Sequence, residues 1–483
     1  MKEFYLKSQF NLPLSDLFQW HIRDGAFERL NPPWSPLYIV SKKGSVDNRG
    51  IVIVKKPIIK DIGIRWKIRH GDYIRNKTFK DTQIEGLFSF WEHQHNFSED
   101  LTTSILEDKI KYSLPLGPIG NIFSSLVDNN LENIFKYRHR ITKIDTYTHL
   151  KVKDPKINKI LISGSSGFIG SALIPFLTTG GYNVTRMLRN KPNFKYDIAK
   201  RIYLNKDGDI ECFSNNINST DSSSGSPDTN SHFDAVINLN GESIFGLWNK
   251  KKKQKIFDSR VKFTRFLCNN LVKMDKPPKV LISASAIGIY GNDHELIFDE
   301  FYERNRNESK DFLSDICSQW EEATDLAKSA GIRVVNLRTG IVLGASGGLV
   351  KLYTKMNRLK INMKITKSEN WLSWIALDDL LRVILFCVCN NNIYGPLNAV
   401  SPNNTSLNDL IKTLEKIWNT KIDFKVSRKM LERILGEMSQ YTIFADNKVT
   451  PQKLISNNFN FIFKDLEIAM RHTLGKLNTP ELD

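Results

Sequence analysis

The chain has 483 residues, of which 41% are hydrophobic and 25% are charged. This composition is typical of a globular protein with a large buried core, and the length corresponds to about three domains. The most apolar run, residues 380–389, is about half as long as the ~20 residues that a helix needs to cross a membrane. Residues 1–7 carry an early acid and no apolar or Arg/Ser-rich stretch, so we predict a cytoplasmic protein without a transmembrane segment.

The formal net charge is +17 at neutral pH, a sign that suits nucleic acid, an anionic membrane or an anionic ligand. Most of the lysines are spread along the chain. The densest run, residues 250–253, accompanies Trp248, Ile256 and Val261 in the pattern of an amphipathic helix. We interpret this run as the solvated face of a helix, with a nucleic-acid patch as the alternative, and predict no nucleic-acid partner.

The five cysteines are scattered and include no Cys-x2-Cys pair. They are Cys212, Cys268, Cys317, Cys387 and Cys389. Their spacing suggests neither a zinc site nor a redox dithiol, and it favours reduced core thiols over disulfides.

Residues 1–150 have the pattern of an independent α+β unit. Leu14, Leu17 and Phe18 begin an apolar periodicity that predicts a helix over residues 14–30, which Pro32 ends. The other elements predicted here are strands at residues 4–10, 37–41, 50–56, 63–70, 77–85 and 87–97, followed by a helix at 122–141. Antiparallel strands followed by a long helix indicate a curved sheet that grips the helix, with a cavity between them.

Two histidines alternate with aromatic residues in the strand predicted at 87–97. Since His93 and His95 are two residues apart, both face the same side of the strand. Two such histidines can hold a metal, but no third ligand with a recognisable spacing accompanies them. We therefore interpret them as polar groups lining a pocket and predict no metal site.

A polar linker at residues 145–158 precedes a second unit with a strand, a Gly-rich turn, a helix and a strand in succession. This order predicts a doubly wound parallel sheet of the Rossmann type. Residues 214–231, which are rich in Ser, Asn, Asp, Gly and Pro, are interpreted as a flexible surface loop. A helical tail follows residue 403, with a strand predicted at 459–461 and a last helix that ends near Leu474.

The Gly-rich turn of the second unit has the features of a dinucleotide-binding loop. It directly follows the strand at 159–163, and Gly164, Gly167 and Gly170 lie three residues apart before a helix. Gly164 allows the tight turn, Gly167 lets a pyrophosphate approach the backbone, and Gly170 lets the helix pack closely on the strand. The remaining predicted contacts of this loop are Ser166, Phe168 and Ile169 at the positive end of the helix.

The end of the second strand, residues 182–188, distinguishes the two nicotinamide cofactors. Arg189 occupies the position where NAD-binding proteins carry an acid, and Asn190 and Lys191 follow it. A cation there suits the 2′-phosphate of NADP, so NADP(H) is the predicted cofactor. The alternative is an exposed arginine without a specific role in a basic protein.

An ordered series of motifs gives the chain a resemblance to known proteins. Beyond the glycine loop, the series comprises residues 235–242, 259–260, 281–285, 290–291, 320–322, 337–344, 373–375 and 395–398. It resembles the extended short-chain dehydrogenases, and among them the atypical nucleoside-diphosphate-sugar epimerases, a group also described as cell-division-inhibitor-like. The tail resembles the small C-terminal domain of that family. Residues 20–30, 32–34, 90–97 and 112–120 resemble START-like (SRPBCC) helix-grip proteins.

The resemblance implies three domains and further cofactor contacts. The domains are a START-like ligand-binding domain at 1–150, an NADP-binding Rossmann domain at 158–402 and a small C-terminal domain at 403–483 that completes the substrate lobe. The implied contacts are Leu239 and Asn240 along the adenine-ribose side, Arg260 towards a cofactor phosphate, and Ser283 and Val342 on the nicotinamide half. Each of these five is alternatively an ordinary core or helix-surface residue.

The catalytic residues depart from the family pattern. Extended short-chain dehydrogenases combine a Ser after the fifth strand with a Tyr-x3-Lys pair on the next helix. Ser285 matches the Ser, but residues 310–319 hold neither Tyr nor Lys at that spacing, and Tyr290 is the only nearby phenol. We predict Ser285 and Tyr290 as the catalytic pair. The family's Gly-rich loop is missing from residues 348–373, which places the use of a sugar nucleotide in question.

Two functional interpretations follow from these observations. The first is an NADP(H)-dependent oxidoreductase or epimerase-like enzyme with a small-molecule substrate such as a sugar nucleotide, whose START-like domain holds an apolar ligand. The alternative is a non-catalytic NADP(H)-binding regulatory protein, which the missing Tyr–Lys pair favours. A homodimer is the candidate assembly in either case.

Overall fold

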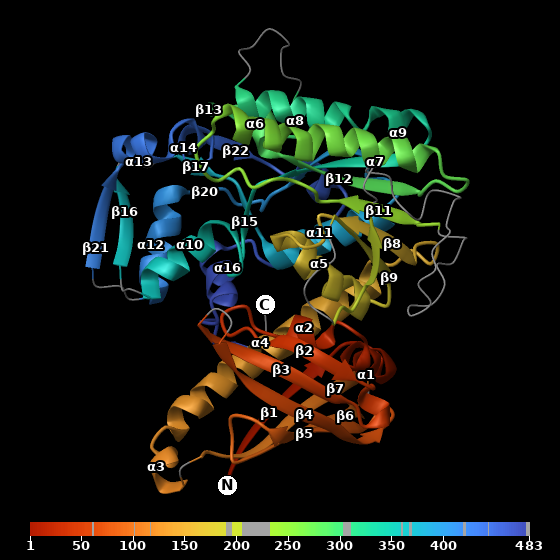
Figure 1. Cartoon of the computed structure of the whole chain (residues 1–483), viewed down its shortest axis with the longest axis vertical. Helices are drawn as coiled ribbons and strands as arrows, with labels where there is room; N and C mark the ends of the chain where they lie inside the picture. The colour runs from red at the N-terminus through yellow and green to blue at the C-terminus, as the bar shows by residue number, and fades with distance from the viewer. Residues whose placement is uncertain are drawn as a thin grey trace.

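The computed structural model describes residues 1–59, 62–100, 102–115, 117–189, 196–204, 232–302, 311–358, 361–366, 370–418, 422–442 and 444–479. The predicted low-complexity loop at 214–231, together with Cys212, Asn190 and Lys191, lies outside these residues. Within them, no helix is both long and apolar enough to cross a membrane. Figure 1 shows an antiparallel sheet at one end of the molecule and a helix-covered parallel sheet at the other.

The N-terminal unit is a seven-stranded antiparallel sheet with the order β1-β7-β6-β5-β4-β3-β2, and the long helix α4 packs against it. Its elements are β1 (Lys2–Phe10), α1 (Leu14–Ile22), α2 (Ala26–Leu30), β2 (Tyr38–Lys43), β3 (Ile51–Ile59), β4 (Ile62–Ile74), β5 (Thr78–Glu85), β6 (Phe90–Asp100), β7 (Thr103–Ser113), α3 (Gly117–Asn121) and α4 (Ser124–Lys151). Two aromatic-rich clusters, one around Phe18 and one around Phe135, fill the inner face of the sheet.

Three sequence expectations for this unit need correction. The helix predicted at 14–30 is two helices, because Gly25 between them has a φ of 95°, a left-handed conformation that interrupts the helix. Strand β7 was not predicted, although it pairs with both β1 and β6 and so joins the first strand to the rest of the sheet. Helix α4 continues to Lys151, so Asp145 is not in a polar linker but is buried in the helix.

The second unit contains the predicted Rossmann sheet. Its strand order is β10-β9-β8-β11-β12-β14-β19, and neighbouring strands run parallel. The first six strands follow the 3-2-1-4-5-6 order of a doubly wound dinucleotide-binding sheet. These strands are β8 (Lys159–Ser163), β9 (Asn183–Leu188), β10 (Lys200–Tyr203), β11 (Ala235–Asn238), β12 (Val280–Ala286), β14 (Arg333–Thr339) and β19 (Gly395–Ala399).

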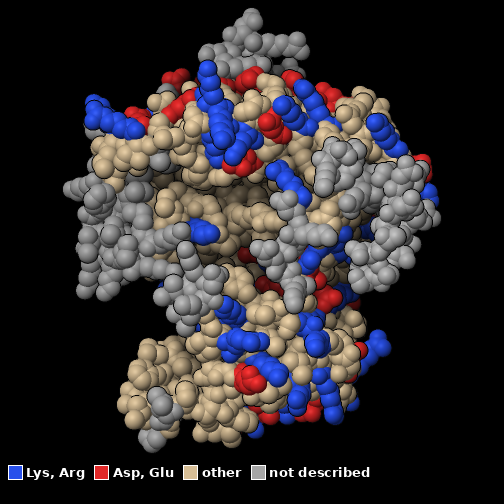
Figure 2. All heavy atoms as spheres, in the orientation of Figure 1, with Lys and Arg blue, Asp and Glu red and all other residues tan. Residues whose placement is uncertain are grey.

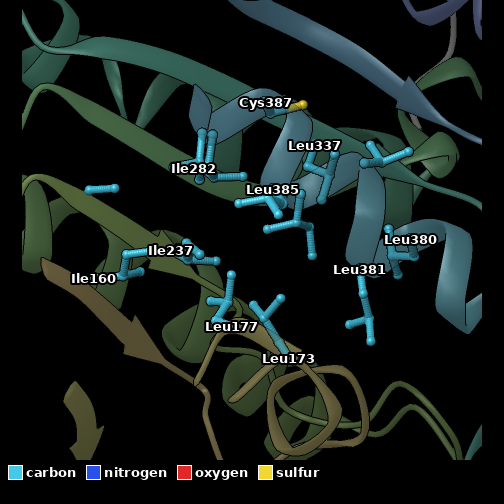
Figure 3. Close-up of a cluster of buried hydrophobic side chains, with 14 of the residues drawn as sticks. Ile160, Leu173, Leu177, Ile237, Ile282, Leu337, Leu380, Leu381, Leu385 and Cys387 are labelled. Carbon is cyan, nitrogen blue, oxygen red and sulfur yellow. The ribbon is translucent and has the colours of Figure 1, made fainter. Parts of the chain in front are cut away.

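Helices cover both faces of the parallel sheet. They are α5 (Phe168–Thr179), α6 (Lys250–Phe257), α7 (Phe263–Val272), α8 (Phe312–Glu322), α9 (Asp325–Ser329) and α11 (Leu377–Cys389), with a π-helical turn at Asp258–Lys262 and a 3-10 turn at Ile287–Tyr290. On one face, Leu173 of α5 and Leu385 of α11 point towards Ile237 and Ile282 of the sheet (Figure 3). The apolar run predicted at 380–389 is thus the buried helix α11, and it contributes to the main core.

The remaining elements form a lobe beside the carboxyl ends of the sheet strands. They are β13 (Asp293–Phe298), β15 (Ile341–Leu343), α10 (Gly348–Arg358), β16 (Ile361–Thr366), β17 (Trp371–Leu372), β18 (Trp374–Ala376), β20 (Thr405–Ser406), α12 (Leu407–Trp418), β21 (Ile422–Ser427), α13 (Arg428–Leu435), α14 (Glu437–Tyr441), β22 (Asn447–Val449), α15 (Gln452–Ser456) and α16 (Leu466–Thr473). The strand predicted at 459–461 is irregular backbone, and Phe461 packs into the main core.

A buried ionic network joins the N-terminal unit to the rest of the chain. Arg29 donates to both carboxylate oxygens of Asp145 at 2.7 Å and to Asp378 of α11 at 3.0 Å. The second oxygen of Asp378 contacts His472 of α16 at 2.9 Å, and Arg140 of α4 donates to the other ring nitrogen of that histidine at 2.9 Å. Because these groups come from both units and are shielded from solvent, the two units share an interior.

Candidate cofactor and substrate site

The glycine loop between β8 and α5 has the shape of a phosphate cradle. A Cβ atom at Gly164 would lie 2.4 Å from the backbone of Leu239, and one at Gly170 would lie 2.5 Å from the carbonyl oxygen of Gly164. These two positions therefore accept only glycine. A Cβ at Gly167 would meet only that same carbonyl oxygen, at 3.2 Å, so the space in front of Gly167 is open. The first backbone N–H groups of α5 face this space, where they suit an anion.

A buried arginine, which the sequence analysis did not identify, supports the loop from behind. Arg186 in β9 donates to the carbonyl oxygen of Ser165 at 3.1 Å and to Asp197 at 2.8 Å. These contacts fix the turn and place the Arg186 guanidinium near the phosphate-binding backbone. The sequence did not predict this role, because an arginine within an apolar strand indicates only that the buried pattern is interrupted there.

A cavity of about 570 Å³ runs from the glycine loop to the C-terminal lobe. Figure 2 shows a hollow with largely uncharged walls in the upper part of the molecule, below a group of Lys and Arg side chains. Ten of the predicted site residues line the cavity, namely Gly164, Gly167, Phe168, Ile169, Gly170, Leu239, Asn240, Arg260, Ser285 and Val342. The structure thus brings together residues from the amino-terminal and the carboxyl-terminal halves of the Rossmann unit.

Four predicted site residues lie outside the lining of this cavity, namely Ser166, Arg189, Ser283 and Tyr290. Ser283 is fully buried in β12, where its hydroxyl accepts a long hydrogen bond of 3.4 Å from Asn238. Arg189 is exposed just beyond β9, and its guanidinium donates to the Oδ1 atom of Asn240 at 3.0 Å. Because Asn240 does line the cavity, Arg189 stands at its rim.

Arg260 contributes the cation nearest the centre of the cavity. It projects from the π-helical turn, donates to the carbonyl oxygen of Glu242 at 3.0 Å and stacks 5.1 Å from the ring centroid of Trp320. Burial lowers the pKa of Arg260 from its usual value, but a guanidinium stays protonated in proteins. A fixed charge in a largely apolar wall is suited to an anionic group of a ligand.

Ser285 reaches the cavity at the end of β12 and has a strong structural partner. Its hydroxyl donates to Glu321 at 2.7 Å, and Arg338 binds the same carboxylate through two contacts of 2.8 and 2.9 Å. Since the Ser285 proton is committed to a carboxylate, the oxygen can accept a hydrogen bond from a ligand hydroxyl. Glu321 and Arg338 occur in motifs that carried the family resemblance, but no role had been assigned to them.

The Tyr290 hydroxyl is held within the protein and does not face the cavity. It accepts from Arg338 at 3.0 Å, and its proton lies within reach of Asn398 at 2.8 Å and the carbonyl oxygen of Asp299 at 2.9 Å. Burial, only partly offset by Arg338, raises the pKa of Tyr290 to about 12. These contacts favour a neutral phenol that positions Arg338 and Ser285.

The helix that would carry the Tyr-x3-Lys pair presents other residues to the cavity. Leu313 and Cys317 of α8 are four residues apart, the spacing of that pair, and both belong to the cavity lining. Burial raises the pKa of Cys317 to about 12, so its thiol is neutral at physiological pH. At these two positions the cavity therefore has an apolar side chain and an un-ionised thiol.

The part of the cavity towards the C-terminal lobe is mostly apolar. Within the described chain, Arg260 and Asp311 are the only charged residues of the lining, and Asp311 caps α8 through the backbone N–H groups of Leu313 and Ser314. Lining residues on this side that the sequence analysis did not assign include Phe245, Thr339, Tyr353, Trp371, Leu431 and Tyr441. They come from elements far apart in sequence, so no local motif marks them.

Comparisons with known proteins agree with this architecture. The NAD dependent epimerase/dehydratase family profile matches residues 160–398, and a C-terminal domain of unknown function, DUF1731, matches residues 426–473. An epimerase family protein of Bacillus subtilis, YfhF, is 32% identical over 321 residues, which cover 66% of this chain and 99% of that protein.

Two solved structures extend the comparison. A nucleoside-diphosphate sugar epimerase from Corynebacterium glutamicum is 26% identical, with a TM-score of 0.75 over 98% of this chain and 90% of that chain. The human epimerase family protein SDR39U1, solved with NADPH, shares the fold at 23% identity and a TM-score of 0.57, over 66% of this chain and all of that chain.

These matches confirm the predicted epimerase family and its C-terminal domain. They leave the START-like assignment of the first 150 residues as a prediction. We conclude that the chain belongs to the NAD dependent epimerase/dehydratase family, with an extended short-chain dehydrogenase unit followed by the DUF1731 domain.

Proposed function

We propose that this protein is an NADP(H)-dependent oxidoreductase of the epimerase type that acts on a small, largely apolar carbonyl or hydroxyl compound. The observation that carries the proposal is the single cavity that connects the glycine loop, Ser285 and the apolar lobe. A dinucleotide on the loop and a substrate under the lobe would share this cavity. The bound cofactor supplies a hydride donor or acceptor.

The choice of NADP(H) over NAD(H) rests on charge at the rim of the cavity. Arg189 follows β9 directly and is oriented by Asn240, a residue that lines the cavity. A guanidinium binds a phosphate through two donors, whereas a ribose hydroxyl gains little from it. Arg260, deeper in the cavity, is the candidate partner of the pyrophosphate.

The lining of the lobe favours an apolar substrate over a sugar nucleotide. A nucleoside diphosphate needs cations and many polar groups, but among the described lining residues Arg260 is the only cation, and it lies on the cofactor side. Leu352, Trp371 and Leu431 instead offer apolar surface. A compound with one polar oxygen placed at Ser285 and an apolar body against the lobe matches these walls.

The residues around Ser285 orient a substrate oxygen more effectively than they move its proton. The Ser285 hydroxyl donates to Glu321, which also pairs with Arg338. A substrate hydroxyl can donate to the Ser285 oxygen, whereas a carbonyl oxygen would have to accept the Ser285 hydrogen bond in place of Glu321. Tyr290 remains neutral because burial raises its pKa to about 12. With no group tuned near neutral pH at this place, the substrate proton exchanges with water, and we expect slow turnover.

A non-catalytic role is the second candidate, favoured by one observation. Leu313 and Cys317 face the cavity at the Tyr-x3-Lys spacing and offer no phenolate or ammonium group. A protein that binds NADP(H) and signals its redox state needs the cradle but not proton transfer. In this interpretation the same cavity binds the cofactor without consuming it.

For the first 150 residues we propose a helix-grip domain with an apolar ligand. This proposal is supported by the arrangement of α4 against the antiparallel sheet and by the aromatic side chains between them. Among these, Trp66, Phe88 and Trp91 pack together, with ring centroids of Trp66 and Trp91 5.2 Å apart.

One assay separates the two candidate functions. The full chain is mixed with NADPH, and cofactor fluorescence is followed with apolar aldehydes, quinones and sugar nucleotides in turn. If the protein is an oxidoreductase, we expect NADPH fluorescence to change on binding and then to decay slowly after an apolar carbonyl compound is added. Ser285→Ala should slow the decay, whereas Ser283→Ala, on the same strand but outside the lining, should not. Binding without decay across the panel would reject the oxidoreductase in favour of the second candidate.

A further inference from the structure

The core of the N-terminal unit contains a cluster of histidines and aspartates that the cofactor site does not use. It lies between the two aromatic-rich clusters of the sheet's inner face, beside helix α4. Its members are His70, Asp81, His93, His95, Asp108 and His139. Burying ionisable groups in an apolar core is unfavourable unless they are paired or bind an ion, so the cluster needs an explanation.

The sheet register brings three potential metal ligands together. His93 and His95 point inward from β6, and Asp81 of β5 lies directly opposite His93. One ligand atom from each of the three residues lies within 4.8 Å of the others. Sequence spacing could not reveal this third ligand, because Asp81 meets the histidines only through the pairing of β5 with β6.

Each of these residues has one ligand atom occupied by an outer partner. The Nε2 atom of His93 is hydrogen-bonded to Asp108 at 2.9 Å, and the Nδ1 atom of His95 lies 2.7 Å from the same carboxylate oxygen. The Oδ1 atom of Asp81 is 2.6 Å from the Nδ1 atom of His70. Nε2 of His95 and Oδ2 of Asp81, which lie 3.8 Å apart, remain as potential ligand atoms, and His93 adds a ring nitrogen to the same group.

The outer partners form the second layer that metal-binding histidines usually have. Asp108 is hydrogen-bonded to His93, lies 2.7 Å from Nδ1 of His95, and is itself held by the Nε2 atom of His139 at 2.7 Å. The Nδ1 atom of His139 contacts Ser8 at 2.8 Å. A carboxylate behind a histidine ligand fixes the ring and makes the free nitrogen a better donor. Such outer partners would position ring nitrogens of His93 and His95 for an ion, whereas a pocket for a purely apolar ligand would not need them.

We propose that Asp81, His93 and His95 form a binding site for a divalent transition-metal ion inside the N-terminal unit. The separation of 3.8 Å between Nε2 of His95 and Oδ2 of Asp81 is close to the value of about 3.4 Å expected for neighbouring ligands of a tetrahedral ion. Two histidines and one carboxylate leave a position open, the pattern of catalytic zinc and of non-haem iron(II) sites.

The site has a route to solvent on one side. The side chain of Asp81 is 21% exposed, whereas those of His93 and His95 are 5% and 9% exposed. An ion would therefore enter past Asp81 and meet the histidines last.

The test measures metal bound by the full chain. The protein is stripped with a chelator and dialysed against Zn²⁺, or against Fe²⁺ without oxygen, and bound metal is counted by atomic spectroscopy. We expect one ion per chain, and Co²⁺ in the same site should show the visible absorption of a low-coordinate nitrogen and oxygen site. The variants His93→Gln with His95→Gln, and separately Asp81→Asn, should weaken binding by about 100-fold, because each removes an inner ligand.

The matched control is His149→Gln, which removes a half-buried histidine of α4 that packs on Phe176, away from the cluster. It should keep one ion per chain, and NADPH binding in every variant verifies that the protein is folded. Absence of stoichiometric binding of any of these ions to the parent would overturn the proposal. Parental affinity in Asp81→Asn or in the double histidine variant would also overturn it, because the ion would then lie elsewhere.

Discussion

Replacing Arg29 by Met should strongly destabilise the contact between the N-terminal unit and the Rossmann unit. The side chains of Arg29, Asp145 and Asp378 are 6%, 0% and 12% exposed, and Arg29 makes all three short contacts among them. Methionine keeps the length and apolar stem of the arginine but leaves Asp145 without its hydrogen-bonded cation and Asp378 with His472 as its remaining partner. Removing one partner of a buried ion pair costs about 3–5 kcal/mol.

The effect can be measured as the loss in free energy of unfolding in urea, monitored by circular dichroism. A matched control is Lys42→Met, which breaks the more exposed pair with Asp24 and should cost less than about 1 kcal/mol. The same loss in both variants would refute the reasoning. It would mean that the Arg29 network, although buried, contributes no more than a surface ion pair.

The loss in Arg29→Met should also depend on pH. Burial already raises the pKa of Asp145 to about 6 with Arg29 in place, and removing the cation can only raise it further. A carboxyl whose pKa is higher in the folded than in the unfolded state destabilises the fold above its folded pKa. That penalty disappears as pH falls towards the unfolded value of about 4. The difference between parent and variant should therefore shrink from pH 8 to pH 5, and a constant difference would contradict this cause.

Three further predictions concern the cofactor and substrate site. In a fluorescence titration, Arg189→Ala should weaken NADPH binding by about 10-fold and leave NADH binding unchanged. The control variant Lys200→Ala, on the next strand, should change the affinity for neither cofactor. Equal losses of affinity for both cofactors in Arg189→Ala would contradict a 2′-phosphate contact. Tyr290→Phe should lower the free energy of unfolding by about 1–3 kcal/mol, because Arg338 and Asn398 lose a hydrogen-bond partner, while turnover of the folded protein stays within about 3-fold of the parent. A selective loss of turnover would restore Tyr290 as the proton donor. Leu313→Tyr combined with Cys317→Lys should raise NADPH oxidation by at least about 10-fold if the site is an oxidoreductase, and an unchanged rate in a folded variant would favour the binding-only role.

The strongest sequence predictions were those in which a local pattern has one physical solution. Gly164 and Gly170 follow a short buried strand at fixed spacing, and the structure shows that a Cβ at either place would strike backbone. The strand at 159–163 was predicted with its observed bounds for the same reason. The motif series and the alternation of strands and helices then sufficed to predict the family and a doubly wound parallel sheet.

The features that were missed depend on contacts between distant parts of the chain. Asp81 lies opposite His93 only through the register of β5 with β6, and Arg338 and Asn398 hold the Tyr290 hydroxyl away from the cavity. Asp145 looked like part of a polar linker because its cation, Arg29, is more than a hundred residues away in sequence. The polarity of a single residue therefore predicted the wrong environment for its side chain where its hydrogen-bond or ionic partner lay on another element.

The most direct test of the central claim compares NADPH binding to the parent chain and to Gly167→Val. At this glycine a Cβ is tolerated by the fold, since it meets only the carbonyl oxygen of Gly164, but a branched side chain would fill the space where a pyrophosphate approaches. In isothermal titration we predict one NADPH per parent chain and a loss of about 100-fold or more in the variant, with unchanged thermal stability. Parental affinity in a folded Gly167→Val protein would show that the glycine loop is not the cofactor site.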